Sequence, residues 1–194
     1  MKNRIILLFS LFISLGAVCQ DDGIQTLLNP DTKIRGFGGP LMSFTVVNGE
    51  FAHIMGGGGG ILLDDKVFFG GFGGGMTNNI QVNNNLYEDF NIQFGYGGLW
   101  IGYIHNGSSP FHPVASVQFG WGGVSMDDNA DVSIYYDGFF VLNPTLELEM
   151  NLTQFMRAGI GGSYRLTGGV NLDGLNDADF SGPEVQLNFK FGWF

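Results

Sequence analysis

Hydrophobic and polar residues alternate along the last eleven positions of this 194-residue chain, from Glu184 to Phe194. One set of alternate positions is apolar: Val185, Leu187, Phe189, Phe191 and Trp193. The other set is polar or small: Glu184, Gln186, Asn188, Lys190 and Gly192. A period of two is typical of a β-strand with two unlike faces. Such a strand would bury its apolar face in a soluble sandwich, or turn it towards lipid in a membrane barrel.

Three stretches inside the chain repeat this pattern. In the first, Phe90, Ile92, Phe94 and Tyr96 are predicted on the apolar face, opposite Asn91, Gln93 and Gly95. In the second, Leu146, Leu148, Met150 and Leu152 oppose Glu147, Glu149 and Asn151. In the third, Ala158, Ile160, Tyr164 and Leu166 oppose Arg157, Gly159, Ser163 and Arg165. The apolar face is bulky each time, and the other face is glycine, small polar or charged.

Eight β segments follow from this pattern and from the turn residues between them. They cover residues 33–47, 50–63, 66–77, 86–104, 112–126, 132–151, 156–168 and 184–194. Asn48-Gly49, between the first two segments, is a strong signal for a two-residue hairpin turn. The number of segments is even, and each is long enough for the roughly 9–11 tilted residues that cross a bilayer.

Composition decides between the two environments. Charged residues make up 13% of the chain and aromatic residues 14%, whereas soluble domains carry about 25% charged residues. A soluble barrel would need its charges outside, yet the non-apolar face here is mostly glycine. Small side chains fit the narrow lumen of an eight-stranded barrel. The sequence therefore predicts an all-β fold, an eight-stranded antiparallel transmembrane up-and-down β-barrel after a cleaved signal peptide.

A four-residue unit rich in glycine occurs once in each of five predicted strands. The units are Gly36–Gly39, Gly71–Gly74, Gly95–Gly98, Gly120–Gly123 and Gly159–Gly162. After Gly97-Gly98 the apolar positions change from even to odd numbers, which predicts a β-bulge there. A phosphate-binding glycine loop is the alternative, but no helix pattern follows any of these units.

The N-terminal residues have the pattern of a secretion signal. Lys2 and Arg4 precede an apolar run, and Ala17-Val18-Cys19 offers a cleavage site. The predicted division is a signal peptide, 1–19, a short periplasmic leader, 20–31, and a barrel, 32–194. Cys19, the only cysteine, would leave with the signal, and lipid attachment to Cys19 is the alternative. No later apolar run is long enough for a transmembrane helix.

The predicted lumen face contains a cluster of charges. Glu147 and Glu149 lie on one strand, and Arg157 and Arg165 lie on the next. Because two carboxylates this close in a low-dielectric lumen need a counter-charge, Arg157 is predicted within about one pairing step of Glu149. Asp137 is predicted to pair with Arg165. We interpret these five residues as a charge network that fills the lumen, with a catalytic carboxylate pair or a solute-selective channel as alternatives.

The three histidines lie in different segments without metal-ligand spacing. His105 and His112 are predicted to be turn or interfacial residues. His53 is predicted near Ser43 across the first hairpin, so a hydrolytic arrangement, as in outer-membrane lipid-modifying enzymes, is a second functional hypothesis. No catalytic residue, cofactor or metal is assigned from the sequence.

The formal net charge of −10 argues against a nucleic-acid partner. Acidic and amide residues gather in three longer predicted loops, 78–85, 127–131 and 167–183. Asp127, Asn129 and Asp131 alternate like the start of a calcium loop, but Val132 and Gly138 stand where glycine and glutamate are needed. These loops are therefore candidates for binding an extracellular partner or loosely held cations.

Together these features resemble the small bacterial outer-membrane β-barrel proteins. The resemblance rests on the signal peptide, the eight alternating strands and the terminal aromatic residue. Three stretches look like a recurrent pattern of uncharacterised members: Phe139–Thr153, Gly162–Arg165 and Gly174–Asp179. The resemblance implies an outer-membrane location in contact with lipid, both termini in the periplasm and the longer loops outside.

The resemblance also implies that the barrel assembly machinery recognises the last strand. The residues that would be recognised are Phe189, Phe191, Trp193 and Phe194, of which Phe194 is one residue out of step with the others. The predicted function is a structural or surface-binding barrel without catalysis, and a narrow small-solute channel is a third hypothesis.

Overall fold

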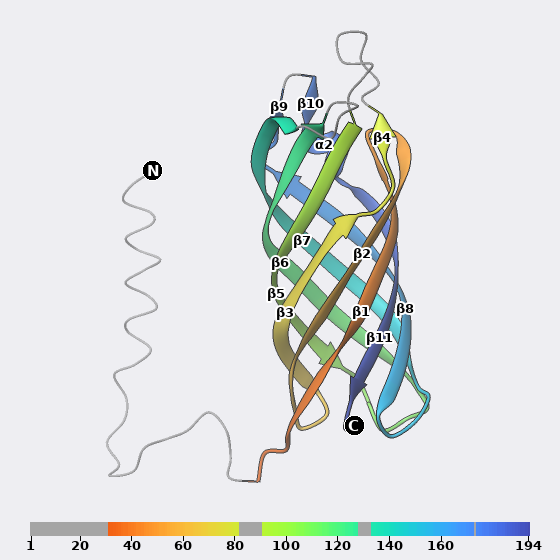
Figure 1. Ribbon diagram of the computed structural model, residues 1–194. Helices are drawn as coiled ribbons and strands as arrows, with labels where there is room; N and C mark the ends of the chain where they lie inside the picture. Colours follow the sequence, from red (N-terminus) through yellow and green to blue (C-terminus); the bar gives the residue numbers. More distant parts are fainter. Residues whose placement is uncertain (1–30, 82–90, 128–132, 173) are drawn as a thin grey trace, which may run out of the picture. The chain divides into compact units, whose positions relative to one another are not determined.

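The structure, a computed structural model, describes residues 31–81, 91–127, 133–172 and 174–194. Within these residues eight long antiparallel strands form a closed barrel (Figure 1). They are β1 (Ile34–Val47), β2 (Glu50–Leu63), β3 (Val67–Met76), β5 (Asn91–Ile104), β6 (Phe111–Asp127), β7 (Ser133–Asn151), β8 (Met156–Gly168) and β11 (Gly182–Gly192). Each strand pairs with its neighbours along the chain, and β11 pairs with β1 to close the ring. The predicted up-and-down barrel is confirmed.

The two ends of the barrel differ. β1 starts and β11 finishes at one end, which we call the terminal end (Figure 1). The opposite end, the loop end, carries four short elements: β4 (Ile80–Gln81), β9 (Asn171–Leu172), β10 (Leu175–Asn176) and α2 (Asp177–Phe180). Within the described residues, the helical part is far too short to serve as a membrane span. The predicted signal peptide, and the leader up to residue 30, lie outside the described residues.

The turns between strands use residues that tolerate a left-handed backbone. Asn48 and Gly49 have φ values of 50° and 81°, as a two-residue hairpin turn requires. The predicted turn is therefore confirmed. Asp64 and Asp65, with φ values of 49° and 58°, make the equivalent turn at the terminal end.

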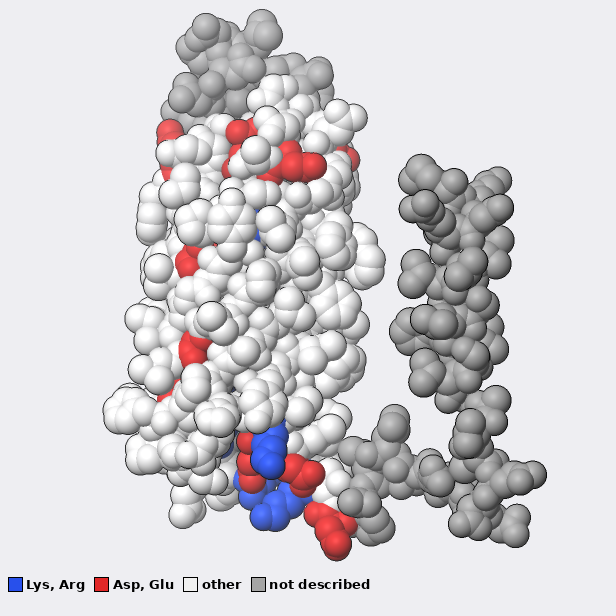
Figure 2. Space-filling model, turned by 180° about the vertical axis from the view of Figure 1, so that it is seen from behind, with Lys and Arg blue, Asp and Glu red and all other residues white. Residues whose placement is uncertain are grey.

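The outer wall of the barrel is apolar. Leu146 and Trp193 are 73% and 74% exposed, and they belong to a belt of large exposed side chains. This belt includes Val67, Phe69, Leu99, Tyr103, Trp121, Phe140, Leu148, Ile160, Tyr164 and Val185. Figure 2 shows the same wall almost free of charged side chains between its ends. A soluble protein does not expose a continuous apolar surface of this kind, so the barrel is a membrane-spanning one.

The predicted faces of the stretch 90–96 are wrong. Ile92, Phe94 and Tyr96 are buried in the lumen, and Phe90 lies outside the described residues. The β5 strand has apolar residues on both faces, because Leu99, Ile101 and Tyr103 line the outer wall while Trp100 and Ile104 continue inward. The apolar lumen residues at the loop end were therefore mistaken for lipid-facing ones.

The predicted β-bulge at Gly97-Gly98 is also wrong. The register of β5 with β6 and with β3 runs without a shift from Gly95 to Tyr103. Even-numbered residues point inward along the whole of β5. The apolar positions change from even to odd numbers because the bulky residues before Gly97 face the lumen and many of those after Gly98 face outward. The strand itself does not slip.

The glycine-rich part of the wall joins β2 and β3 at close range. Gly60 and Gly70 face each other across the ladder, and a Cβ atom on Gly60 would overlap the Phe69 carbonyl oxygen. Gly162 on β8 differs, because nothing lies within 4 Å of the position of its Cβ. Glycine is thus a steric requirement at Gly60 and not at Gly162.

We expect Gly60→Ala to lower the free energy of unfolding by about 1–3 kcal/mol, since the added methyl group forces two backbones apart. Gly162→Ala is the matched control and should change stability by about 0.5 kcal/mol or less. Urea unfolding of both variants in detergent micelles, followed by tryptophan fluorescence, measures the difference. Equal midpoints for the two variants would show that the wall at β2 and β3 can relax freely.

Candidate functional site

One side of the lumen is lined by polar and charged side chains. They come from inward positions of neighbouring strands and are buried: His112 and Gln118 on β6, Asn143, Thr145, Glu147 and Glu149 on β7, Arg157 and Arg165 on β8, and Glu184, Gln186, Asn188 and Lys190 on β11. We call this set the polar ladder. The alternation of β7, β8 and β11 places these residues inside, and the pairing of β8 with both neighbours brings them together.

The terminal end of the polar ladder is an ion cluster around Glu149. Lys190 contacts both Glu149 and Glu147, and its Nζ lies 3.4 Å from Glu147 Oε1. Arg157 donates to Glu149 Oε1 over 3.2 Å, and His112 Nε2 lies 3.0 Å from the same oxygen. Asn188 donates to the other oxygen of Glu147. Buried charges are tolerated in this way, each paired and hydrogen-bonded.

Lys190 also faces three aromatic rings, from the neighbouring strand β1 and from β3 and β5 across the lumen. Its Nζ lies 5.2 Å from the Phe68 ring centre, 5.3 Å from Trp100 and 5.9 Å from Phe37. An ammonium group is attracted to the faces of such rings. Lys190 therefore joins the polar ladder to the apolar side of the lumen at the terminal end.

Both ring nitrogens of His112 have polar partners. Nδ1 lies 3.0 Å from the Ser109 carbonyl oxygen, and Nε2 lies 3.0 Å from the Glu149 carboxylate. With His112 1% exposed, these two contacts fix the orientation of its ring between the β6 turn and the ion cluster.

A second ion pair lies towards the loop end. Arg165 contacts Glu184, and its Nε donates to the Phe180 carbonyl oxygen over 2.7 Å. Glu184 also accepts from Asn143 over 2.9 Å and from Ser163 over 3.2 Å. The predicted pairing of Arg165 with Asp137 is therefore wrong.

Asp137 has a different role at the loop end. Its two carboxylate oxygens accept from the backbone N–H groups of Gly138, at 2.8 Å, and Asn171, at 2.6 Å. It fixes β9 to the start of β7 and takes no part in the lumen network. The alternation of β7 puts Asp137 on the inward side of the strand, but Asp137 lies nearer the loop end than Arg165 does.

The segment 169–181 folds back over the loop end as a cap. Phe180, 0% exposed, stacks on Phe94 at 5.3 Å between ring centres, and Phe94 stacks on Phe139 at 4.9 Å. Asn176 begins α2 with a capping box that includes Asp179. The Asp179 carbonyl oxygen accepts from the Asn48 backbone N–H over 2.8 Å. The cap is thus fastened to β8 and to the β1–β2 turn.

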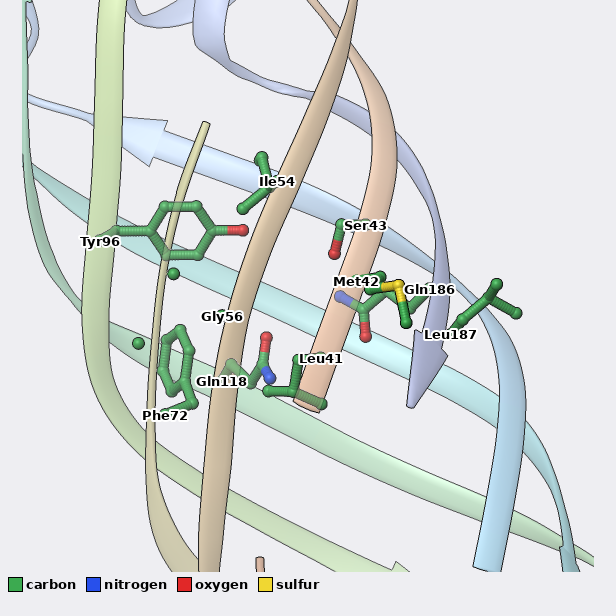
Figure 3. Close-up of a pocket in the computed structure, with 12 residues that line it drawn as sticks. Leu41, Met42, Ser43, Ile54, Gly56, Phe72, Tyr96, Gln118, Gln186 and Leu187 are labelled. Carbon is green, nitrogen blue, oxygen red and sulfur yellow. The ribbon is translucent and has the colours of Figure 1, made fainter. Parts of the chain in front are cut away.

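The interior between the two ends is filled. A cluster of buried apolar residues that includes Ile54, Val124 and Val141 occupies the loop half. Between it and the ion cluster lies a cavity of about 20 Å³, room for about one water molecule. Figure 3 shows Ser43, Gln118 and Gln186 around this cavity, whereas Leu187 points away from it.

Comparison with solved structures places this geometry in a known fold. The crystal structure of Neisserial surface protein A matches with a TM-score of 0.61 at 11% identity, over 84% of this chain and 97% of that one. The N-terminal β-barrel domain of Pseudomonas aeruginosa OprF matches with a TM-score of 0.53 at 13% identity, over 82% of this chain and 97% of that one. This is the fold of the small outer-membrane β-barrels. No protein-family model matches the chain, and no curated protein sequence matches it.

The outer-membrane-type barrel does not assemble the serine–histidine arrangement. Ser43 is buried in the lumen, whereas His53 is on the outer face, stacked on Phe44 at 5.0 Å and bonded to Thr77 over 2.8 Å. The two side chains therefore lie on opposite sides of the wall. Among the described residues, no group of three or more His, Cys, Asp and Glu is placed to hold a metal ion.

The terminal aromatics of the outer-membrane-type barrel divide into two sets. Phe189, Phe191 and Trp193 follow the outward phase of β11. Phe194, one residue out of step, packs its ring 4.0 Å from the Arg157 guanidinium carbon, and its N–H donates to the Gln154 carbonyl oxygen. The change of phase lets Phe194 cover the ion cluster at the terminal end.

Three ionisable members of the polar ladder were not assigned to the network from the sequence. Glu184 and Lys190 were placed on the inward face of the last strand, but their partners depend on the register of β11 with β8 and of β8 with β7. His112, predicted to be a turn or interfacial residue, is instead buried against Glu149. The usable signal was its position two residues before Val114, on the inward phase of β6.

Proposed function

We propose that the protein is a non-conducting barrel of the bacterial outer membrane that binds a positively charged partner through its loop end. The orientation that we propose puts the terminal end in the periplasm and the loop end outside the cell. The orientation is supported by the fold, which is shared with solved outer-membrane barrels. The binding function is supported by the distribution of charged residues.

The distribution of acidic residues is the observation that carries the proposal. Ten of the eighteen acidic residues belong to the loop-end part of the sequence: seven fall in segments that connect strands there, and Glu50, Asp127 and Asp137 fall near the adjoining strand ends. The connecting segments contain no Lys or Arg. The ten are Glu50, Glu88, Asp89, Asp127, Asp128, Asp131, Asp137, Asp173, Asp177 and Asp179; among them 88, 89, 128, 131 and 173 lie outside the described residues. Figure 2 shows Asp and Glu gathered below the upper end, whereas Lys and Arg lie together with Asp and Glu at the lower end. A surface of one sign attracts partners of the other.

A filled lumen supports binding over transport. Cap, apolar cluster and ion cluster follow one another along the barrel axis, and the space between them holds about one water molecule. Planar-bilayer recordings of the purified barrel should show no stepwise conductance. Ohmic steps from a folded preparation would favour the channel instead.

Binding can be tested with polylysine and the barrel in nanodiscs, where both ends are accessible. Glu50→Gln/Asp179→Asn should weaken binding about 2- to 30-fold, because each exposed ion pair contributes about 0.2–1 kcal/mol. Asparagine at 179 keeps an acceptor for the Asn176 N–H. Binding should also fall with salt.

The matched control is Asp64→Asn/Asp65→Asn, which removes the same charge at the terminal end. This control should leave polylysine binding unchanged. If both double variants weaken binding equally, net charge and not the loop end is responsible, and the proposal fails.

We also propose that the assembly machinery recognises the outward aromatics of β11. Phe191 and Trp193 are exposed and available for such a contact, whereas Phe194 is engaged by Arg157. Trp193→Ala should therefore reduce the amount of folded barrel in membranes more than Phe194→Leu does, as measured by heat-modifiable migration on gels.

A further inference from the structure

We infer that the outer wall has a specific binding site for an anionic glycerophospholipid, with one acyl chain in a groove and the phosphate at Lys66. The groove has a volume of about 930 Å³ and crosses the wall from β3 to β11. It follows one row of strand pairings: Val67 with Tyr103, Tyr103 with Ala115, Ala115 with Leu146, and Leu146 with Gly162.

The shape of the groove comes from the sizes of the side chains in this row. Ala115 and Gly162 are small, and nothing lies within 4 Å of the position that a Gly162 Cβ would take. Tyr103, Leu146 and Tyr164 stand out beside them, at 48%, 73% and 50% exposure. Small residues between bulky ones leave a channel in the surface about as wide as a missing side chain. A flexible hydrocarbon chain fits such a channel, because the groove lies within the apolar belt and requires an apolar occupant.

The charge at one end of the groove selects the headgroup. Val67, the first residue of β3, lines the groove, and Lys66 directly precedes it at the rim of the terminal end. Lys66 is exposed, and its ammonium group makes no ion pair with any described residue. The exposed cations among the described residues, Lys33 and Lys66, both lie at this rim, whereas the loop end is acidic. Asp64 and Asp65 share this rim, where Asp65 is paired with Arg35, so Lys33, Arg35 and Lys66 outnumber the carboxylates of this turn by one. A phosphate is therefore favoured at the terminal end over the acidic loop end.

These two features together specify the ligand as a lipid with a hydrocarbon chain and an anionic phosphate. In the proposed orientation the terminal end meets the periplasmic leaflet. The lipid would lie obliquely, with its headgroup beside Lys66 and one chain passing over Ala115 towards Gly162. This inference needs only that the barrel spans the membrane, and it does not depend on the partner proposed for the loop end.

The chain offers a matched pair of variants that fill or spare the groove. Gly162→Leu places a side chain in the groove, and nothing lies within 4 Å of the position of its Cβ atom. Gly168→Leu does the same outside the groove on the same strand, because nothing lies within 4 Å of a Cβ there either. Lys66→Glu and Lys33→Glu form a second pair, with equal changes of charge at the same rim.

The test is native mass spectrometry of the full barrel released from nanodiscs of phosphatidylcholine with a minority of phosphatidylglycerol. Wild type should retain one phosphatidylglycerol in preference to phosphatidylcholine, by about fivefold for one lysine at the surface. Gly162→Leu should lose the retained lipid and Gly168→Leu should keep it. Lys66→Glu should lose the preference for phosphatidylglycerol, and Lys33→Glu should keep most of it. Heat-modifiable migration establishes that each variant is folded.

Three outcomes would overturn the inference. Equal lipid retention by Gly162→Leu and Gly168→Leu would mean that the groove does not hold the chain. If the barrel retains both lipids equally, or if Lys66→Glu does not change the preference, then Lys66 does not bind the phosphate. The retained lipid would in that case belong to the non-specific lipid around the barrel. A barrel dimer that Gly162→Leu dissociates would assign the groove to a second copy.

Discussion

Lys190→Met is expected to lower the free energy of unfolding by about 3–5 kcal/mol, because it leaves two buried carboxylates without their shared cation. Lys190 contacts Glu147 and Glu149, which lie two residues apart on β7. Methionine fills a similar volume and packs well against aromatic rings, so the three rings around Lys190 lose little. The loss should therefore come from the carboxylates. Urea unfolding in detergent micelles, followed by tryptophan fluorescence, measures it.

A second substitution separates charge from packing. Glu147→Gln/Lys190→Met removes one carboxylate together with the cation, and it should recover a large part of the stability lost in the single variant, as a coupled pair does. Lys66→Met, at an exposed lysine, is the control and should change stability by about 0.5 kcal/mol or less. A double variant as unstable as Lys190→Met would show that Lys190 acts through its packing.

The barrel itself was readable from the sequence because lipid and lumen impose opposite demands on alternate residues. From Asn143 onward in β7, and in β8 and β11, the inner face is polar or glycine and most outer residues are bulky, so the period of two assigned both faces correctly. In β5 both faces are apolar, since Phe94 and Tyr96 belong to a dry core inside the loop half. Periodicity cannot then say which apolar face meets lipid. The error over Ile92, Phe94 and Tyr96 has this physical origin.

The contacts between side chains of β8 and β11 could not be predicted from the sequence. Alternation placed Arg157 and Lys190 in the lumen, but only the register of β8 with β11 puts them directly opposite each other. The partner of Arg165 depends on the same register, which brings Glu184 next to Ser163. Inward orientation is a local property, whereas the choice of ion-pair partner needs the relative shift of two strands.

The cap at the loop end was the least predictable part. Residues 169–181 are rich in Gly, Asn and Asp, which is typical of a solvated loop. The single large apolar residue near its end, Phe180, turns it inward by stacking on Phe94. Asp137 and Asp177 then satisfy backbone N–H groups of the segment, so acidic residues that suggest a ligand site also hold the cap in shape.

Phe180→Ala is expected to lower the free energy of unfolding by about 3–5 kcal/mol, the usual loss when a fully buried phenylalanine is truncated. It should also release the cap. Amide hydrogen exchange at Asn48 and Asn171, whose N–H groups donate to Asp179 and Asp137, should become faster than in the wild type. Conductance should stay absent, because the other residues of the apolar cluster and the whole ion cluster remain in place below the cap.

Phe155→Ala is the matched control, since Phe155 is 51% exposed in a turn at the terminal end. It should cost less than about 1 kcal/mol and leave exchange at Asn48 and Asn171 unchanged. A cap held mainly by its backbone hydrogen bonds would respond differently, with little change in exchange at these two amides after the loss of Phe180. That result would mean that the hydrogen bonds accepted by Asp137 and Asp177, and not the Phe180 ring, hold the cap in place.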